Sequence, residues 1–259
     1  MIDIRLSDNL ELMSEMKDNT VDLIYCDILY GTGRKFKDYQ DLKPKPEVIK
    51  QHYIPRIKEM HRILKDTGSI YLQMDTKISH WVRCIMDSVF SYDRFLNELI
   101  WCYNTQGYSK NKYSSKHDSI LFYSKTKKYT FNAESIRNEK PSESTIKRFG
   151  KEIEKNGFYI DFKSKKKVYE LKGSLPLDWF EMSVLPSAHN ENTGYNTQKP
   201  KALIERIVKA SSNEGDLVAD FYAGSFTTAE VCGDLKRNFI GCDISEKAVE
   251  IGRARVAGF

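Results

Sequence analysis

The chain has 259 residues, of which 40% are hydrophobic and 30% are charged. This composition is typical of a globular protein and excludes disordered, collagen-like and coiled-coil proteins, and no uncharged apolar run approaches the length of about 18 residues that a membrane span needs. The five cysteines form no Cys-x-x-Cys pair and no signal peptide is visible at the start, so we expect a reduced, cytoplasmic protein without disulfides or a metal site.

The net charge of +5 is concentrated in the middle of the chain. Residues 101–175 contain 17 Lys and Arg against 8 Asp and Glu, whereas the remaining residues contain 24 against 28. A positive segment on a nearly neutral scaffold is typical of a surface that binds a polyanion such as nucleic acid. On charge alone, a solvated lysine-rich surface without a partner explains the segment equally well.

Strands and helices alternate over residues 1–132. Val21–Asp27 is a mostly apolar run, as expected for a strand buried on both faces of a sheet. Pro46–Leu64 has hydrophobic residues at helical spacing, and Asp66-Thr67-Gly68 ends that helix. We expect strands at Ile2–Leu6, Val21–Asp27, Ser69–Met74, Phe95–Tyr103 and Ser119–Ser124, and helices at Asn9–Met16, Pro46–Leu64 and Ile78–Val89.

The pattern changes at residues 133–190, where no long hydrophobic periodicity is found. A charged helical stretch precedes two short strand-like pieces, Phe158–Phe162 and Val168–Leu171, which flank the lysine run Lys163–Lys167. We interpret residues 133–190 as an insertion between two halves of one domain, residues 1–132 and 191–259.

Strand and helix alternation returns in the last part of the chain. Pro200 suits the first turn of a helix, where its missing N–H costs nothing, and Ser245 can cap the final helix. We expect strands at Leu217–Phe221 and Asn238–Ile244, and helices at Lys201–Ser211, Thr227–Leu235 and Glu246–Val256. Alternation at both ends predicts an α/β fold, with a doubly wound, mostly parallel sheet covered by helices on both faces.

Four aspartates stand at or beside predicted strand ends: Asp8, Asp27, Asp220 and Asp243. Ligands of doubly wound sheets bind beyond the carboxyl ends of the strands. Asp243 follows Asp220 by 23 residues, close to the spacing of about 20 residues at which an acidic residue meets a ribose hydroxyl. A single aspartate is more often a helix cap or a turn residue, but the four together indicate a nucleotide-type site.

Three segments carry recognisable motifs: Asp27-Ile28-Leu29-Tyr30, 193–200 (TGYNTQKP) and 220–228 (DFYAGSFTT). The first resembles the Asp-Pro-Pro-Tyr motif of the beta-class amino-group DNA methyltransferases, which depend on S-adenosylmethionine. The segment 220–228 (DFYAGSFTT) resembles their cofactor loop Asp-Pro-Phe-x-Gly-Ser-Gly-Thr-Thr, and the segment 193–200 (TGYNTQKP) resembles their Thr-Gly-Tyr-Pro-Thr-Gln-Lys-Pro. The resemblance implies a Rossmann-like methyltransferase fold with circularly permuted motif order, in which residues 133–190 are the target-recognition region.

The same resemblance implies how the cofactor is bound. S-adenosylmethionine would lie over the turn after Asp220, and Asp243 would hold its ribose hydroxyls. Asp8 would accept a hydrogen bond from its adenine amino group, and Lys199 would supply charge to its methionine carboxylate. The residues expected to bind the cofactor are Asp8, Asn9, Asp27, Thr197, Gln198, Lys199, Asp220, Phe221, Ala223, Gly224, Ser225, Thr227, Asp243 and Ile244.

Asp27, Ile28, Leu29 and Tyr30 are the expected catalytic residues. A base amino group is a weak nucleophile, and two acceptors, the carboxylate of Asp27 and the carbonyl of Ile28, would pull it toward tetrahedral geometry. Tyr30 would stack on a base extruded from duplex DNA. An Asp at the first position favours adenine N6 as the target, and cytosine N4 or RNA is the alternative.

The tetrapeptide at residues 27–30 and the cofactor loop at residues 220–228 depart from the family pattern. Ile28 and Leu29 replace the two prolines, so the fixed φ of proline is lost. Phe221 and Tyr222 replace Pro and Phe of the cofactor loop, and Phe226 replaces its second glycine, which places a ring where the family keeps the backbone bare. An impaired subunit that keeps the fold and binds DNA or a partner protein is therefore a second hypothesis.

The DNA-binding residues are expected in two places, the polar segment 103–116 and the loop 31–41. Amides and lysines read base edges, aromatic rings stack on bases, and lysines contact phosphates. The expected residues are Arg34, Lys35, Lys37, Tyr103, Asn104, Gln106, Lys110, Lys112 and Lys116. Double-stranded DNA is thus the expected partner, with nucleoid association through it; the resemblance is also compatible with a homodimer and a cognate restriction endonuclease.

Overall fold

The computed structural model describes residues 1–35, 39–149, 159–162, 167–170, 172–186, 189–195 and 197–259. The chain divides into two compact units, one formed by Met1–Phe131 with Asp178–Phe259 and one by Asn132–Leu177. Lys37 and the lysines at positions 163, 165 and 166 lie outside the described residues. Within the described part of the chain, no helix has the length and apolar character needed to cross a membrane.

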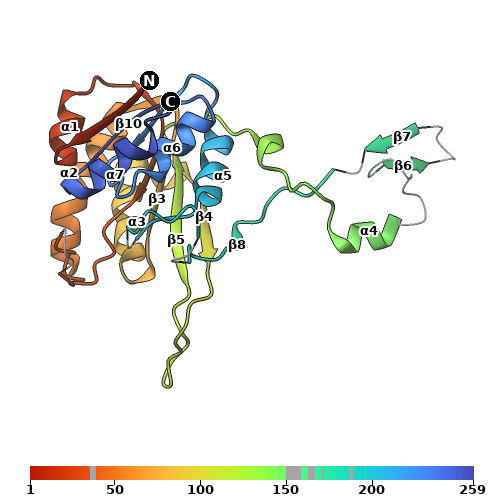
Figure 1. Ribbon diagram of the computed structural model, residues 1–259, viewed down its shortest axis with the longest axis horizontal. Helices are drawn as coiled ribbons and strands as arrows, with labels where there is room; N and C mark the ends of the chain where they lie inside the picture. Colours follow the sequence, from red (N-terminus) through yellow and green to blue (C-terminus); the bar gives the residue numbers. More distant parts are fainter. Residues whose placement is uncertain (36–38, 150–158, 163–166, 171, 187–188, 196) are drawn as a thin grey trace. The chain divides into compact units, whose positions relative to one another are not determined.

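The first unit is built on one eight-stranded sheet (Figure 1). In spatial order its strands are β1 (Ile2–Leu6), β10 (Asn238–Asp243), β9 (Leu217–Asp220), β2 (Val21–Asp27), β3 (Leu64–Asp75), β5 (His117–Ser124), β4 (Phe95–Cys102) and β8 (Trp179–Glu181). The strands from β1 to β3 run parallel, and β5 runs antiparallel to both of its neighbours. The predicted mostly parallel sheet is confirmed.

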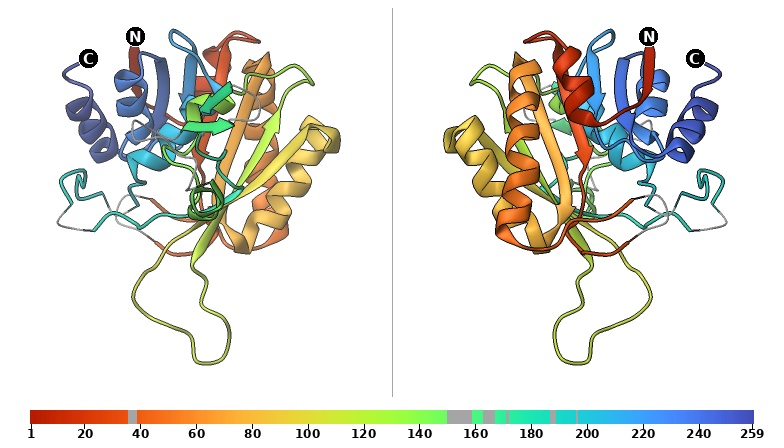
Figure 2. Two further views of the ribbon diagram at one scale, coloured as in Figure 1. Left: turned by 90° about the vertical axis from the view of Figure 1, so that its right-hand side faces the viewer. Right: turned by 90° about the vertical axis from the view of Figure 1, so that its left-hand side faces the viewer.

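Helices cover both faces of this sheet, as Figure 2 shows. The helices α1 (Asn9–Glu15), α2 (Pro46–Ile63) and α3 (Thr76–Phe90) pack on one face, and α5 (Lys201–Ser211), α6 (Thr227–Asp234) and α7 (Glu246–Arg255) pack on the other. A short 3-10 helix, η1 (Tyr92–Arg94), precedes β4. Along β2, Ile24 and Cys26 join the core of the first face, whereas Leu23 and Tyr25 join the second. A strand buried on both sides must be apolar at successive positions, which explains its sequence.

Two features of this unit differ from the expectation. The strand β3 begins at Leu64, immediately after α2, because Leu64 pairs with Val21 before the register shifts and the ladder resumes at Ser69. The strand β8 was not predicted, and it pairs with β4 from Ile100↔Trp179 to Cys102↔Glu181. A strand of three residues at a sheet edge is too short to show a periodic pattern of hydrophobic residues in the sequence.

The strand order reverses between β2 and β9. These two strands pair in parallel, with Leu23 opposite Val218 and Ile24 opposite Ala219. From β2 the sheet continues to β3, and from β9 it continues to β10 in the other direction. The carboxyl ends of β2 and β9 therefore form a topological switch point, the place where doubly wound sheets bind ligands.

The second unit, Asn132–Leu177, contains η2 (Ala133–Ile136), α4 (Glu143–Phe149) and the antiparallel pair β6 (Tyr159–Phe162) and β7 (Lys167–Glu170). Its boundaries differ from the expected insertion, 133–190. Residues 178–190 belong to the first unit, because β8 joins the main sheet and the indole N–H of Trp101 donates to the carbonyl of Met182 at 2.8 Å.

Helix α6 starts from a residue in the left-handed conformation, Phe226, with φ 54° and ψ 35°. For a non-glycine residue this conformation costs about 1–2 kcal/mol. The ring of Phe226 is fully buried and packs edge-on against Phe239 and beside Gly252 of α7. The absence of a side chain at Gly252 makes room for this ring, so burial offsets the backbone strain.

Replacing Gly252 by alanine is expected to destabilise the protein. A Cβ at this position would lie 2.5 Å from Cδ2 of Phe226, and the overpacking cost of about 1–3 kcal/mol outweighs the helix-propensity gain of about 1 kcal/mol. Chemical denaturation of Gly252→Ala measures the loss. Gly258→Ala is the control, because a Cβ at Gly258 meets nothing within 4 Å; equal stabilities of the two variants would contradict the packing argument.

Candidate active site

A cavity of about 1020 Å³ opens at the carboxyl ends of β2 and β9, within the first unit. All residues predicted to act in catalysis or cofactor binding line it: Asp8, Asn9, Asp27, Ile28, Leu29, Tyr30, Thr197, Gln198, Lys199, Asp220, Phe221, Ala223, Gly224, Ser225, Thr227, Asp243 and Ile244. The segments that resemble methyltransferase motifs therefore meet around one space, although they lie far apart in the sequence.

Asp27 ends β2 and is held by two neighbours. Its Oδ2 forms an ion pair with Nζ of Lys199 at 2.5 Å, and its Oδ1 lies 2.9 Å from the hydroxyl of Tyr30. Burial raises the pKa of Asp27 above its ordinary value, and the Lys199 ammonium opposes that rise. Asp27 is thus a largely desolvated carboxylate, which strengthens any hydrogen bond that it accepts.

Hydrogen bonds hold the Ile28-Leu29 segment where the family has prolines. The N–H of Ile28 donates to the carbonyl of Gln73 at 3.0 Å, a bond that proline cannot form. The carbonyl of Leu29 accepts from the hydroxyl of Tyr53 at 2.8 Å. The loop that carries Tyr30 is therefore fixed by contacts to β3 and α2 in place of the pyrrolidine rings.

The turn after β9 is organised by two aspartates. Asp220 is buried and accepts from the N–H of Tyr222 at 3.1 Å and the hydroxyl of Thr228 at 2.7 Å. Burial raises its pKa to about 7. Asp243, at the end of β10, accepts from the N–H of Gly224 at 2.9 Å. Gly224 has a φ of +50°, so it can adopt the tight turn that brings the backbone to the cavity.

Phe226 does not line this cavity. Its ring lies in the core against Phe239 and Gly252, so the aromatic substitution leaves the turn at Ala223 and Gly224 open to the cavity. The structure thus accommodates this departure from the family pattern by repacking behind the loop.

Two side chains of α2 reach the cavity without having been predicted. Arg56 forms an ion pair with Asp8 at 3.1 Å, while Asp8 also caps α1 by accepting from the N–H of Leu10. His52 lies 3.0 Å from the hydroxyl of Tyr222, and burial lowers its pKa to about 4, so its ring is neutral at pH 7. Both occur inside an ordinary helical pattern, which carries no signal of a site.

Asp118, at the start of β5, was also missed. It is buried, and its carboxylate lies within hydrogen-bond distance of Tyr30 at 2.5 Å, Gln73 Nε2 at 2.8 Å and Tyr103 at 3.0 Å. The hydroxyl of Tyr25 in turn donates to Oε1 of Gln73 at 2.7 Å. A lone aspartate after a polar segment gives no sequence signal, because its partners come from three separate segments: the loop after β2, the strand β3 and the residue that follows β4.

The segment before α5 forms a compact turn. Oε1 of Gln198 accepts from the N–H and the hydroxyl of Thr193 at 2.9 and 2.7 Å, and Nε2 of Gln198 donates to the carbonyl of Glu191 at 2.6 Å. This turn presents Thr197 and Lys199 to the cavity.

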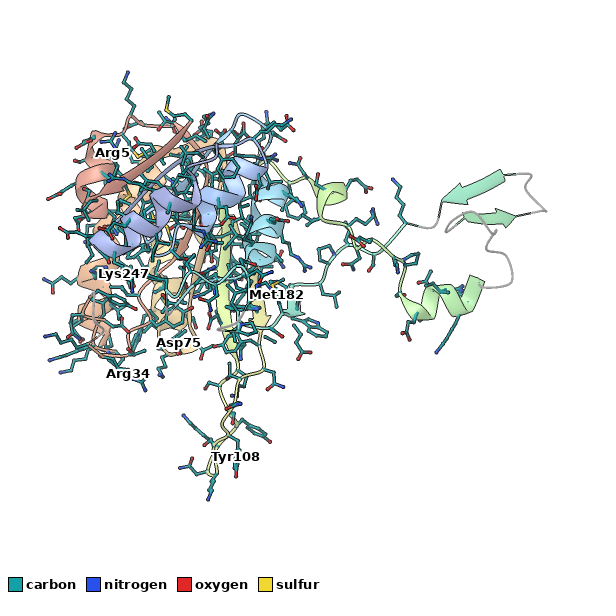
Figure 3. All side chains as sticks on the ribbon, in the orientation of Figure 1. Arg5, Arg34, Asp75, Tyr108, Met182 and Lys247 are labelled. Atoms are coloured by element: carbon teal, nitrogen blue, oxygen red, sulfur yellow. The ribbon has the colours of Figure 1, made fainter. Side chains whose placement is uncertain are left out.

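Of the predicted DNA-binding residues that the structure describes, Tyr103 alone lines the cavity. Asn104, Gln106, Lys110 and Lys112 are exposed on the hairpin between β4 and β5, which projects from the sheet (Figure 1); Figure 3 marks Tyr108 on it. The ammonium of Lys116 donates to the carbonyls of Thr105 and Gln106 and braces the hairpin base.

The loop after Tyr30 carries the exposed residues Arg34 and Lys35. The buried carboxylate of Asp41 accepts from the N–H groups of Gly31 and Thr32 at 3.1 and 2.7 Å and closes the loop. Figure 3 marks Arg34 on the loop. Across the described part of the chain, no group of three or more His, Cys, Asp or Glu could hold a metal ion.

The raised pKa of Asp220 predicts a pH-dependent stability. Because the folded-state pKa of about 7 exceeds the unfolded value of 3.8, this residue's contribution is fully present below pH 4 and is lost as the pH rises toward 7, by about 1.4 kcal/mol per pH unit. We therefore expect Asp220→Asn to gain stability relative to the native protein between pH 4 and 8, measured by urea denaturation. A stability difference that does not change with pH would contradict this.

Comparisons with known proteins agree with this geometry. Residues 21–254 match a family model described as DNA methylase. Type II methyltransferase M.HpaI of Haemophilus parainfluenzae is 30% identical over 252 residues, which cover 96% of this chain and 72% of the relative. DNA adenine methyltransferase YhdJ of Escherichia coli K12 is 29% identical over 251 residues, which cover 96% and 80%.

Solved structures share the fold. PvuII DNA methyltransferase, which is cytosine-N4-specific, superposes with a TM-score of 0.71 at 15% identity, covering 98% of this chain and 86% of that chain. The complex of M1.HpyAVI with SAM superposes with a TM-score of 0.61 at 21% identity, covering 99% and 100%. With the family model matched over most of its length, the chain belongs to the DNA methylase family, the amino-group DNA methyltransferases.

Proposed function

We propose that this DNA methyltransferase transfers a methyl group from S-adenosylmethionine to the exocyclic N6 of adenine in duplex DNA, after the base has left the stack. The observation that carries the proposal is the meeting of Asp27 and Tyr30 with the turn after Asp220 in one cavity. One half of the cavity has the chemistry of a nucleotide site, and the other has acceptors and aromatic rings suited to an extruded base.

The chemistry of the lining residues fits the cofactor. Asp243 offers a carboxylate to ribose hydroxyls, the turn at Ala223 and Gly224 brings the backbone close, and Lys199 offers a cation to the methionine carboxylate. The cavity of about 1020 Å³ is at the upper end of the range of about 300–1,000 Å³ found for ligand pockets, so it has room for a cofactor and a base together. S-adenosylmethionine, when bound, supplies an electrophilic methyl group on a sulfonium.

Asp27 and the carbonyl of Ile28 are the proposed acceptors for the target amino group. As that group becomes tetrahedral and positive in the transition state, hydrogen bonds to a desolvated carboxylate strengthen, which lowers the barrier. Tyr30, Trp101 and Tyr103 supply aromatic rings at the same cavity, with the last two 4.9 Å apart between ring centroids. Such rings can stack on a base that has left the duplex.

The relatives include both target chemistries. YhdJ is named a DNA adenine methyltransferase, whereas the PvuII enzyme is cytosine-N4-specific. The Asp at position 27 favours adenine, and cytosine N4 is the alternative. The impaired-enzyme hypothesis is weakened by the hydrogen bonds of Ile28 and Leu29, which replace the rigidity of the family's prolines.

We also propose that residues 133–190 and the hairpin between β4 and β5 contribute to target recognition. The exposed Lys110 and Lys112 and the exposed ring of Tyr108 suit contacts to phosphates and unstacked bases. We further propose that the protein forms a homodimer and acts in the cytoplasm, associated with the nucleoid through DNA. We also propose a cognate restriction endonuclease as its partner, because several relatives are named type II methyltransferases.

Methylation of cellular DNA tests the proposed reaction. DNA from cells that express the native chain should contain N6-methyladenine in one short sequence context, and Asp27→Ala should abolish it because the acceptor carboxylate is lost. Mass spectrometry of digested DNA and methylation mapping measure both outcomes. Asp22→Asn is the matched control, since Asp22 lies on the same strand, pairs with Lys65 and is outside the cavity.

Three results would contradict the proposal. N4-methylcytosine in place of N6-methyladenine would favour the alternative target, unchanged methylation in Asp27→Ala would refute the role of Asp27, and an absence of methylation together with cofactor-free DNA binding would favour the impaired subunit.

Removing the hairpin lysines should weaken DNA binding. For Lys110→Gln/Lys112→Gln we expect a lower affinity and a salt dependence reduced by about 0.9 per lost phosphate contact. Fluorescence anisotropy with duplex DNA at several salt concentrations measures both. The control is Lys127→Gln/Lys128→Gln, two exposed lysines at the opposite end of β5; an equal effect of the two double variants would refute a specific role of the hairpin.

A further inference from the structure

The hydroxyl of Tyr30 lies between two carboxylates. Its oxygen is 2.5 Å from Oδ2 of Asp118 and 2.9 Å from Oδ1 of Asp27. A hydroxyl has a single proton and can donate it to only one of them at a time. The direction of this one hydrogen bond therefore decides whether Asp27 is already engaged on Oδ1 before a substrate arrives.

The surroundings favour donation to Asp118. Asp27 is balanced by the ammonium of Lys199, whereas Asp118 forms none of the ion pairs found among the described residues. Asp118 is 2% exposed and depends on neutral donors, the amide of Gln73 and the hydroxyl of Tyr103. A buried carboxylate without a cation gains most from a further donor, and its contact with Tyr30 is the shorter of the two.

The amide of Gln73 cannot replace Tyr30 in this role. Its carbonyl oxygen accepts from the hydroxyl of Tyr25 at 2.7 Å, so its NH₂ group faces Asp118 at 2.8 Å. The chain of donors from Tyr25 through Gln73 thus ends on Asp118 and fixes the orientation of that carboxylate.

We propose that Asp118 is a positioning residue for methyl transfer: by accepting the only proton of the Tyr30 hydroxyl, it keeps that proton away from Asp27 and leaves Oδ1 of Asp27 as an acceptor for the target amino group. Each carboxylate oxygen can accept two hydrogen bonds, but if Tyr30 donated to Asp27, both oxygens would already accept one, from Tyr30 and from Lys199. The carboxylate would then stabilise the developing positive charge less well. This inference rests on the proposed function of Asp27.

Single-turnover kinetics test the inference with Asp118→Leu, a substitution of similar size that removes both acceptor oxygens. The methyl-transfer rate at saturating DNA and cofactor should fall about 10- to 100-fold, the effect of weakening one charged hydrogen bond. The dissociation constants for S-adenosylmethionine and for duplex DNA should stay within about threefold. A merely structural role would change binding and stability along with the rate.

The second-site variant Tyr30→Phe separates the proposed role from a loss of folding. Without the hydroxyl there is no proton to misdirect, so Asp118→Leu in the Tyr30→Phe background should slow the reaction by less than about threefold relative to Tyr30→Phe alone. Asp118→Asn, which keeps one acceptor oxygen, should show an intermediate loss; it carries the same double-mutant test if Asp118→Leu does not fold.

Asp87→Asn is the matched control. Asp87 also accepts from a tyrosine hydroxyl, that of Tyr123 at the other end of β5, and it does not line the cavity. Its rate should equal that of the native protein. If Asp118→Leu lowered the methyl-transfer rate equally in the native protein and in Tyr30→Phe, the inference would be overturned. This holds even if Asp27→Ala abolishes methyl transfer. Unchanged transfer in Asp27→Ala would instead overturn the proposed function.

Discussion

The parallel pairing of β2 with β9 is the contact on which the rest of the site depends. It joins segments almost 200 positions apart, with Leu23 opposite Val218 and Ile24 opposite Ala219. Because side chains alternate along each strand, this register directs Cys26 into the core and carries Asp27 to the same edge as Asp220. A register one residue away would exchange the two faces of β2 and bury the wrong side chains.

The switch point also gathers acidic groups in a desolvated space. Lys199 lies against Asp27 and opposes the rise in pKa that burial causes there, whereas Asp220 relies on neutral donors and burial raises its pKa to about 7. Burial of two carboxylates with one cation lowers stability. The same burial makes hydrogen bonds to Asp27 stronger, which is the property that a methyl-transfer site requires.

The departures from the family motifs have local structural replacements. The N–H of Ile28 and the carbonyl of Leu29 hold the loop that carries Tyr30 through Gln73 and Tyr53, where the family uses prolines. Phe226 adopts a conformation that suits glycine, and Gly252 on α7 provides the space for its ring. Contacts from neighbouring residues thus hold both loops in place of the family's own motif residues. The loops still line the cavity.

The sequence by itself determined the doubly wound fold and about half of the residues that line the cavity, because strand and helix periods and short motifs are local patterns. Only the tertiary structure decided that Lys199 pairs with Asp27, that Asp118 lies beside Tyr30, and that Arg56 of α2 reaches Asp8 at the cavity. These contacts join residues separated by 172, 88 and 48 positions. No local pattern encodes such pairs, since hydrogen bonds across the cavity form only after the sheet has brought its strands together.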